Sequence, residues 1–315
     1  MKKNFLHILT AVLSLLFLST LFVSCEGKDD EVAHKGAKTA MMKSIADNVP
    51  YIQSVEKDEQ YDLFDGIKIT DALFTYCTKP TRMLIAEIDL NNNITIATSA
   101  PDNKNEVGKK LQTIVEQAER AEEGGRKVYL GINGDYYSQK GSEWIPGGVF
   151  YKDGVAIKTE IGYEADNIFF IKKDGTAHIA TLPEFQLIAS DVQSAIGGWQ
   201  RLVTDGKATG TFTVNDNSMM FHPRTFLGVS KDNRKVYFFV IDGRQPEYSN
   251  GMRVSDMMLL CEGAGCYQAL NIDGGGSTTM VKRVESPSLS FEIMNVPSDN
   301  PARPVINGLQ VIEKE

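Results

Sequence analysis

The sequence predicts an α+β fold that is rich in β-strands and has few helices, and three observations carry this prediction. Short apolar and β-branched runs recur along the chain, four Asp-Gly pairs lie between such runs, and only two segments have helical periodicity. Asp-Gly favours the tight turns that join antiparallel strands. Each helical segment is followed by an apolar strand, so we expect α/β units embedded in mixed sheets.

The strand signals predict hairpins and tight turns. Residues 82–90 and 94–98 flank Asn91-Asn92-Asn93 and predict a hairpin. The four Asp-Gly pairs predict tight turns at residues 65–66, 153–154, 174–175 and 205–206.

Two segments have the apolar spacing of a helix. Residues 105–123 carry apolar side chains on one face and end at Gly124-Gly125. Residues 254–262 form the second segment, which ends at Gly263. Apolar strands are expected after them, at residues 128–132 and 267–272.

The N-terminus resembles a bacterial lipoprotein signal peptide over residues 1–24. Lys2 and Lys3 precede an apolar stretch, and a small residue stands before Cys25, which we expect to be lipidated. A transmembrane anchor is the alternative, although the apolar stretch is close to the shortest that spans a bilayer. We therefore expect a secreted, lipid-anchored protein of the outer membrane, on its periplasmic or cell-surface face. Residues 25–50 are polar and aperiodic and predict a flexible tether, and residues 51–315 predict one domain.

The charge balance argues against nucleic acid as a partner. The net charge is −8, and removal of the signal peptide with Lys2 and Lys3 makes it more negative. Nucleic-acid binding requires a basic face. An anionic ligand must then be bound by a local cluster of arginines.

Three apolar strands end in an acid next to a glycine. The acids are Asp135, Asp242 and Asp273. Strand ends are frequent ligand sites in sheets that contain α/β units. An Asp-Gly turn is the alternative explanation, but these three strands are more continuously apolar than the others. We predict that the three carboxylates share one catalytic site.

Glycines, hydroxyls and arginines near these acids predict a site for an oxyanion. Glycines expose backbone N–H groups, and arginine binds phosphate or carboxylate with two parallel hydrogen bonds. The predicted binding residues are Asn133, Gly134, Arg224, Thr225, Arg244, Gly274, Gly275, Gly276, Ser277, Thr278, Asn295 and Arg303.

Several familiar motifs are absent from the sequence. The glycine block fits neither a P-loop nor a dinucleotide fingerprint, and Ser277 lacks the downstream glycine of a nucleophile elbow. No His/Cys/carboxylate spacing indicates zinc. We expect no required cofactor, although the aspartates leave Ca²⁺ or Mg²⁺ open as ligands.

These segments together resemble the phosphodiester glycosidase family, which includes the catalytic domain of the mannose 6-phosphate uncovering enzyme and bacterial relatives. The resemblance covers roughly residues 80–313. The matching pieces occur in the family's order: 133–137, 146–148, 224–225 with Gly228, 242–244, 255–260, 271–279, Asn295 and Arg303.

The resemblance implies a glycosidase that cuts a sugar-1-phosphodiester, such as an N-acetylglucosamine-1-phosphodiester, between the anomeric carbon and the phosphate. The substrate would be a glycan or sugar phosphate of the envelope or the environment. Asp135 and Asp273 are both candidates for nucleophile or base, and Asp242 for orienting Arg244. Two alternatives stay open: a non-catalytic surface lipoprotein that binds anionic glycans, and a metal-dependent phosphodiesterase that cleaves P–O.

Overall fold

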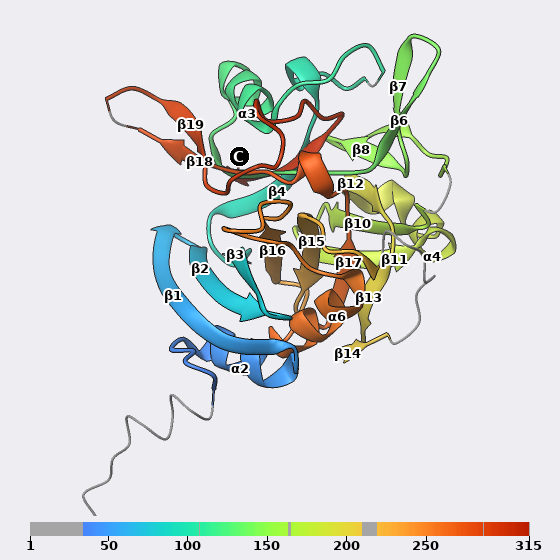
Figure 1. The fold of residues 1–315 in the computed structure, drawn as a ribbon. Helices are drawn as coiled ribbons and strands as arrows, with labels where there is room; N and C mark the ends of the chain where they lie inside the picture. Colours follow the sequence, from blue (N-terminus) through green and yellow to red (C-terminus); the bar gives the residue numbers. More distant parts are fainter. Residues whose placement is uncertain (1–33, 107, 163–164, 210–218, 286, 315) are drawn as a thin grey trace, which may run out of the picture.

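The computed structural model describes residues 34–106, 108–162, 165–209, 219–285 and 287–314. Three β-sheets and a small ribbon make up most of this part of the chain, with four α-helices at their margins (Figure 1). The predicted α+β, β-rich class is confirmed, but the expectation of α/β units in mixed sheets is wrong. Every strand pairing in the described residues is antiparallel.

The largest sheet has eight strands, and its central strands are buried on both faces. In spatial order they are β1 (Ile52–Phe64), β2 (Ile67–Tyr76), β3 (Lys79–Asp89), β16 (Lys235–Ile241), β15 (Arg224–Val229), β17 (Gln268–Asn271), β13 (Arg201–Thr204) and β14 (Lys207–Ala208).

Two five-stranded sheets and a ribbon complete the β structure. The first is β11 (Ala177–Thr181), β10 (Asn167–Lys172), β12 (Val192–Gly198), β8 (Phe150–Lys152) and β9 (Val155–Lys158). The second is β19 (Ser290–Ile293), β18 (Met280–Val284), β5 (Val128–Asn133), β20 (Gly308–Glu313) and β4 (Ile94–Ser99). The ribbon pairs β6 (Tyr137–Lys140) with β7 (Glu143–Pro146).

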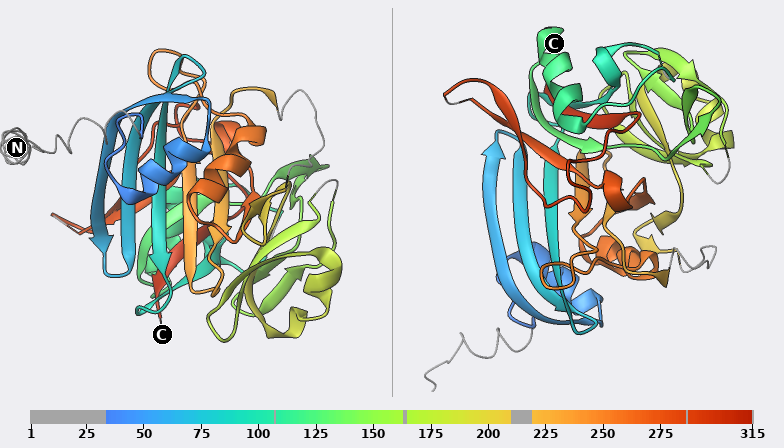
Figure 2. Two further views of the ribbon diagram at one scale, coloured as in Figure 1. Left: turned by 90° about the horizontal axis from the view of Figure 1, so that it is seen from below. Right: turned by 45° about the horizontal axis from the view of Figure 1, so that its top comes forward.

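The helices cover the sheets at separate places. Among the described residues they are α2 (Ala40–Asn48), α3 (Ile114–Glu123), α4 (Leu182–Gln186) and α6 (Val254–Gly263), with 3-10 turns at η1 (Pro101–Asn103), η2 (Ala189–Asp191) and η3 (Gly275–Ser277). Figure 2 shows α2 and α6 side by side on one face of the large sheet. No helix in the described ranges is both long enough and apolar enough to cross a membrane.

Alternating side chains of the central strands enter two different cores. Phe226 and Phe239 pack with α2 and α6 on one face, whereas Leu227 and Phe238 pack against the smaller sheets on the other. Successive side chains of a strand point to opposite faces. Burial on both faces explains why these strands are continuously apolar in sequence.

The predicted turns are confirmed, but the predicted hairpin is wrong. The four Asp-Gly pairs join β1 to β2, β8 to β9, β10 to β11 and β13 to β14. Residues 82–90 and 94–98 instead belong to different sheets, because β3 pairs with β2 and β16 while β4 pairs with β20. The partners of β3 and β4 are distant in sequence, which a local turn signal does not reveal.

Two further expectations need correction. The predicted helix over residues 105–123 begins only at Ile114, because Thr113 and Glu116 form a capping box there. The tether predicted for residues 25–50 is wrong over α2, which buries Met42 and Ile45 in the main core. The helix over residues 254–262 is confirmed as α6. The signal peptide and Cys25 lie outside the described residues.

Candidate active site

The topology brings two of the three strand-end acids to one edge of the large sheet. β15 lies between β16 and β17 and is antiparallel to both, so β16 and β17 end where β15 begins. Asp242 follows β16 and Asp273 follows β17. Asp135 comes from β5 of a different sheet.

Asn133 joins the two sheets at this edge. Its Nδ2 donates to the Asp273 carbonyl at 2.7 Å, and its Oδ1 accepts from Thr225 Oγ1 at 2.8 Å and from Thr279 N at 3.2 Å. The Asp273 N–H donates to the Gly134 carbonyl at 3.1 Å. Asn133, Gly134 and Thr225, which we predicted to bind ligand, therefore also hold the strand ends together.

Asp135 lies in a narrow pocket made by glycines. Its Oδ2 accepts from the Gly148 N–H at 2.7 Å, and a Cβ on Gly197 would lie only 2.9 Å from that oxygen. Its backbone N–H donates to Asn307 Oδ1 at 2.8 Å. Asp135 Oδ1 is buried and has no hydrogen-bond partner among the described residues. One carboxylate oxygen is thus fixed while the other is left for a ligand.

Burial raises the pKa of Asp135 to about 7. The Gly148 N–H and the ammonium of Lys158 lower this pKa, and the nearby charge of Asp273 raises it. A carboxyl with a pKa near neutrality is suited to acid or base catalysis.

Asp273 shares the site with Asp135 but has different neighbours. Burial raises its pKa to about 6, although its side chain is partly exposed. The Ser277 hydroxyl and the Gly274 N–H lower this pKa, with the Gly274 N–H donating to Oδ1 at 2.9 Å. The charges of Arg303 and Arg244 lower it further. Asp273 therefore lies close to the two arginines and also close to Asp135.

The prediction that the glycine block exposes its N–H groups as an anion nest is wrong for most of them. The N–H of Gly275 donates to the Pro223 carbonyl at 2.9 Å. The N–H groups of Ser277 and Thr278 close the turn η3, each at 3.2 Å. Together with Gly274, whose N–H bonds Asp273, four donors of the block are already in use.

The glycines instead make room for the arginines. A Cβ on Gly275 would lie 3.0 Å from Arg244 Nη2, and Gly275 has a φ of 62° that disfavours other residues. A Cβ on Gly276 would collide with both Arg303 and Asp299. The guanidinium groups of Arg244 and Arg303 therefore lie directly on the glycine block, next to Asp273.

Arg224 enters the same region from the start of β15. It is buried, its Nε donates to the Met252 carbonyl at 3.0 Å, and its Nη2 donates to the Met220 carbonyl at 3.0 Å. Burial lowers the pKa of Arg224 to about 10, and Tyr136 opposes this shift. Arg224 thus lies near Tyr136, the residue that follows Asp135.

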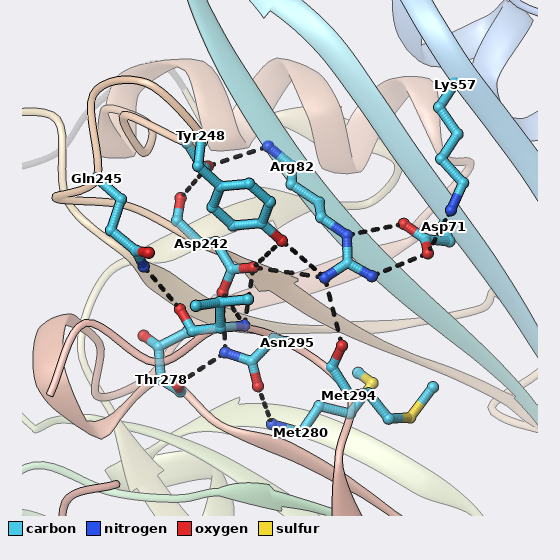
Figure 3. Close-up of polar contacts among 12 residues, drawn as sticks. Lys57, Asp71, Arg82, Asp242, Gln245, Tyr248, Thr278, Met280, Met294 and Asn295 are labelled. Carbon is cyan, nitrogen blue, oxygen red and sulfur yellow. Dashed lines mark hydrogen bonds and ion pairs between the residues drawn. The ribbon is translucent and has the colours of Figure 1, made fainter. Parts of the chain in front are cut away.

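Asp242 does not join the other two acids, contrary to the prediction. Both of its oxygens accept from the Val296 N–H at 3.1 Å, Oδ1 accepts from Asn295 Nδ2 at 2.9 Å, and Oδ2 accepts from Tyr248 at 3.2 Å (Figure 3). Asn295 in turn bonds the backbone of Thr278 and Met280. Asp242 and Asn295 therefore lie in a polar cluster behind the glycine block, with no carboxylate oxygen left for catalysis.

Sequence reasoning missed several residues around the acids. Asn307 and Lys158 contact or face Asp135, and Tyr136 accepts a hydrogen bond from Asn271, which also bonds Gln200. Tyr136 follows a predicted acid and could have been found by its position. Asn307 and Lys158 come from distant segments and carry no local signal.

Unsatisfied polar atoms gather at this site. Of the twelve buried side-chain atoms in the described residues that lack a hydrogen-bond partner, six belong to Asp135, Gln200, Asn271, Ser277, Thr278 and Asn307. Buried polar groups are normally hydrogen-bonded. Their concentration shows that the site has polar groups that protein atoms leave unpaired, although the Ser277 hydroxyl is near enough to Asp273 to lower its pKa. Within the described ranges, no three His, Cys, Asp or Glu side chains are grouped to hold a metal ion.

Paired carboxylates beside arginines are suited to acid or base chemistry on an anionic substrate. The chain belongs to the phosphodiester glycosidase family (NAGPA), whose sequence pattern matches residues 126–312. The family predicted from the sequence is thereby confirmed.

A curated relative and three solved structures are similar to this chain. An uncharacterized SPbeta prophage-derived protein, YomE, of Bacillus subtilis strain 168 is 28% identical over 209 residues, which are 64% of this chain and 29% of that protein. This chain thus spans less than a third of that relative's length.

One similar solved structure is the catalytic domain of zebrafish N-acetylglucosamine-1-phosphodiester alpha-N-acetylglucosaminidase, auto-inhibited by its pro-peptide. It aligns with a TM-score of 0.59 at 19% identity, covering 82% of this chain and 88% of the zebrafish chain. A hypothetical protein from Synechocystis aligns with a TM-score of 0.55 at 10% identity, covering 83% and 65% of the two chains. An exported protein of Burkholderia pseudomallei aligns with a TM-score of 0.50 at 14% identity, covering 74% of each of the two chains. These likenesses establish the shared fold.

Proposed function

We propose that this protein hydrolyses a sugar-1-phosphodiester by breaking the bond between the anomeric carbon and its oxygen. The observation that carries the proposal is the proximity of the buried Asp135 to the partly exposed Asp273, with the guanidinium groups of Arg244 and Arg303 beside Asp273. Water would add a hydroxyl to the anomeric carbon, and the phosphate would leave with the bridging oxygen as a monoester.

The arginines supply the site for the phosphate. Arg244 and Arg303 lie on the glycine block, and their positive charge reaches Asp273. Charge on the departing phosphate is stabilised most by fixed cations in a site that excludes water. Because a phosphate monoester is a good leaving group, these arginines replace much of the general acid that ordinary glycosides need.

The two carboxylates then take different roles. A nucleophile, or a base that activates water, must act on the anomeric carbon from the side opposite to the leaving phosphate. Asp273 adjoins the arginines, whereas Asp135 lies near Lys158 and keeps Oδ1 without a partner in the described residues. We assign Asp135 as nucleophile or base, and Asp273 as the residue that orders the arginines.

The substrate class is the most specific part of the proposal. The zebrafish enzyme of the same fold is named for its action on an N-acetylglucosamine-1-phosphodiester. We propose an N-acetylglucosamine-1-phosphodiester or a similar sugar-phosphate glycan of the cell envelope. A lipid on Cys25 would hold the enzyme at that surface.

Product analysis tests the proposal. The full chain without its signal peptide is incubated with methyl N-acetylglucosamine-1-phosphate, and the products are followed by ³¹P and ¹H NMR. We expect free N-acetylglucosamine and methyl phosphate. Asp135→Asn should abolish product formation, and Glu122→Gln, which alters an ion pair on α3 far from the acids in the fold, should not. Equal activity in the Asp135 variant would reject the assignment.

A further inference from the structure

The residues behind the glycine block form a chain of charges that runs from the edge strand β1 to Asp242 (Figure 3). We propose that Arg82 and Asp242 clamp the segment 294–303 and thereby position Arg303, and that β1 and β2 brace this clamp. The inference rests on the proposed function only in assigning Arg303 to the phosphate. The clamp itself is a structural claim that is tested separately.

Asp242 holds one side of the segment. Its carboxylate accepts from Asn295 Nδ2 at 2.9 Å and from the Val296 N–H at 3.1 Å. Hydrogen bonds to a charged group are stronger than neutral ones. Since Asp242 follows the buried strand β16, it fixes residues 295–296 to the main sheet.

Arg82 holds the other side. Its Nη1 donates to the Met294 carbonyl at 3.3 Å and to Tyr248 at 2.9 Å, and lies 3.7 Å from Asp242 Oδ2. Arg82 on β3 and Asp242 at the end of β16 thus contact three consecutive residues of the segment. These residues are Met294, Asn295 and Val296. A guanidinium has the several donors in a plane that these contacts need.

Asn295 connects the clamped segment to the glycine block of the active site. Its Nδ2 donates to the Thr278 carbonyl at 3.1 Å, and its Oδ1 accepts from the Met280 N–H at 2.8 Å. The same segment continues to Asp299 and Arg303, which lie on Gly276 with Arg303 Nε 2.8 Å from Asp299. The clamp therefore places the glycine block and Arg303 relative to each other.

The brace comes from strands outside the region that matches the family, residues 126–312. Asp71 on β2 accepts from Arg82 Nε at 3.0 Å and from Nη2 at 2.9 Å. Lys57 on β1 donates to Asp71 at 2.9 Å. The paired hydrogen bonds fix the plane of the Arg82 guanidinium, so Asp71 is the residue through which β1 and β2 act on the site.

Asp71→Asn is the decisive variant, because Asp71 touches neither the segment nor the acids. The matched control is Glu122→Gln, which alters the Glu122–Arg283 pair between α3 and β18. The exposed fraction of the side chain is 15% for Glu122 and 11% for Arg283. It is 11% for Asp71 and 18% for Arg82, so the two pairs are buried to a similar extent. Asp242→Asn removes a residue of the clamp itself. If Asp242→Asn does not fold, Asp71→Asn still tests the proposal.

Hydrogen exchange tests the clamp without any substrate. We expect the amide of Val296 to exchange roughly three- to thirtyfold faster in Asp71→Asn. Asp71→Glu should restore part of the protection, and Glu122→Gln should leave it unchanged. Unchanged exchange at Val296 in Asp71→Asn would overturn the clamp, whether or not the protein cleaves phosphodiesters.

A double-mutant cycle tests the link to Arg303. On the phosphodiester substrate, Asp71→Asn should lower kcat/KM roughly three- to thirtyfold in the wild-type background. In the Arg303→Ala background the same change should lower it less than about twofold, because the positioned group is already gone. Additive losses would overturn the positioning role. If the wild type cleaves no phosphodiester, the proposed function fails while hydrogen exchange still decides the clamp.

Discussion

Asp135 and Asp242 are alike in sequence and opposite in setting. Each follows a strongly apolar strand, and their exposures are 1% and 2%, so burial does not separate them. Asp242 has hydrogen bonds to both oxygens, whereas Asp135 keeps Oδ1 without a partner in the described residues. The number of acceptor positions already filled distinguishes the structural acid from the candidate catalytic acid.

A buried carboxylate with hydrogen bonds to both oxygens stabilises the folded protein. A buried carboxylate with one unpaired oxygen lowers the free energy of unfolding. Buried groups without partners are expensive. They persist mainly where a ligand completes them, and function is often gained at the expense of stability. The comparison between Asp135 and Asp242 therefore makes opposite predictions for activity and stability.

The largest expected effect is the loss of turnover in Asp135→Asn. If Asp135 is the nucleophile or base, kcat should fall by about a hundred- to ten-thousandfold. Asp242→Asn should lose much less, through displacement of the 294–303 segment. The measurement is initial rate of methyl phosphate release, with Glu122→Gln as control. A greater loss in Asp242→Asn than in Asp135→Asn would reverse the two assignments.

The next largest effect is expected for Arg303, which we propose binds the phosphate. Arg303→Ala should lower kcat/KM about a hundredfold, because it removes one fixed cation from the leaving group. Gly276→Ala should give a similar loss, since its Cβ would displace Arg303. Kinetics with Arg303→Lys provide the comparison, because lysine keeps the charge but not the planar donors. Full activity in Arg303→Ala would remove Arg303 from the site.

The pH dependence of kcat/KM follows from the two pKa values. Asp135, with a pKa of about 7, must be ionised to act as nucleophile or base, and Asp273, with a pKa of about 6, ionises first. We expect kcat/KM to fall about tenfold for each unit of pH well below 7 and to level off above it. A rate that is highest near pH 5 would contradict the role of Asp135.

The smallest effects concern stability and have opposite signs. The pKa of Asp135 is higher in the folded state than its ordinary 3.8, so stability from its protonated form is lost as pH rises towards about 7. Asp135→Asn should therefore stabilise the protein at pH 8 by on the order of 1–2 kcal/mol, and by less at pH 5. Burial also raises the pKa of Asp242, but hydrogen bonds from Asn295 and the Val296 N–H oppose that shift. Asp242→Asn should destabilise the protein by a similar order, because one acceptor replaces two and these hydrogen bonds are lost. Thermal unfolding at both pH values measures this; destabilisation by Asp135→Asn at pH 8 would contradict the comparison.

The sequence was sufficient for the fold class, the turns and the family, because these depend on local chemistry and residue order. It also predicted that Asp135, Asp273 and arginines lie near one another, which agrees with the neighbours of Asp273. It failed where pairing partners are distant, as for β3 and β4, and where short capping signals override a longer apolar pattern, as at Thr113.

The glycine block shows the same limit at the site. We predicted that its residues bind an oxyanion, but three consecutive glycines do not reveal whether the space is for a ligand or for a side chain. The structure fills it with Arg244 and Arg303. The separation of Asp242 from Asp135 likewise depends on Asn295 and Val296, which are more than fifty residues away from Asp242 along the chain.

Cleavage in H₂¹⁸O tests the central claim most directly, because it shows which bond breaks. The phosphomonoester product is analysed by mass spectrometry, since the hydroxyl of the free sugar exchanges oxygen with water. The account predicts that the methyl phosphate contains no ¹⁸O, because the phosphate keeps its bridging oxygen when the bond to carbon breaks. One ¹⁸O atom in the phosphate would show cleavage of P–O and contradict a glycosidase mechanism.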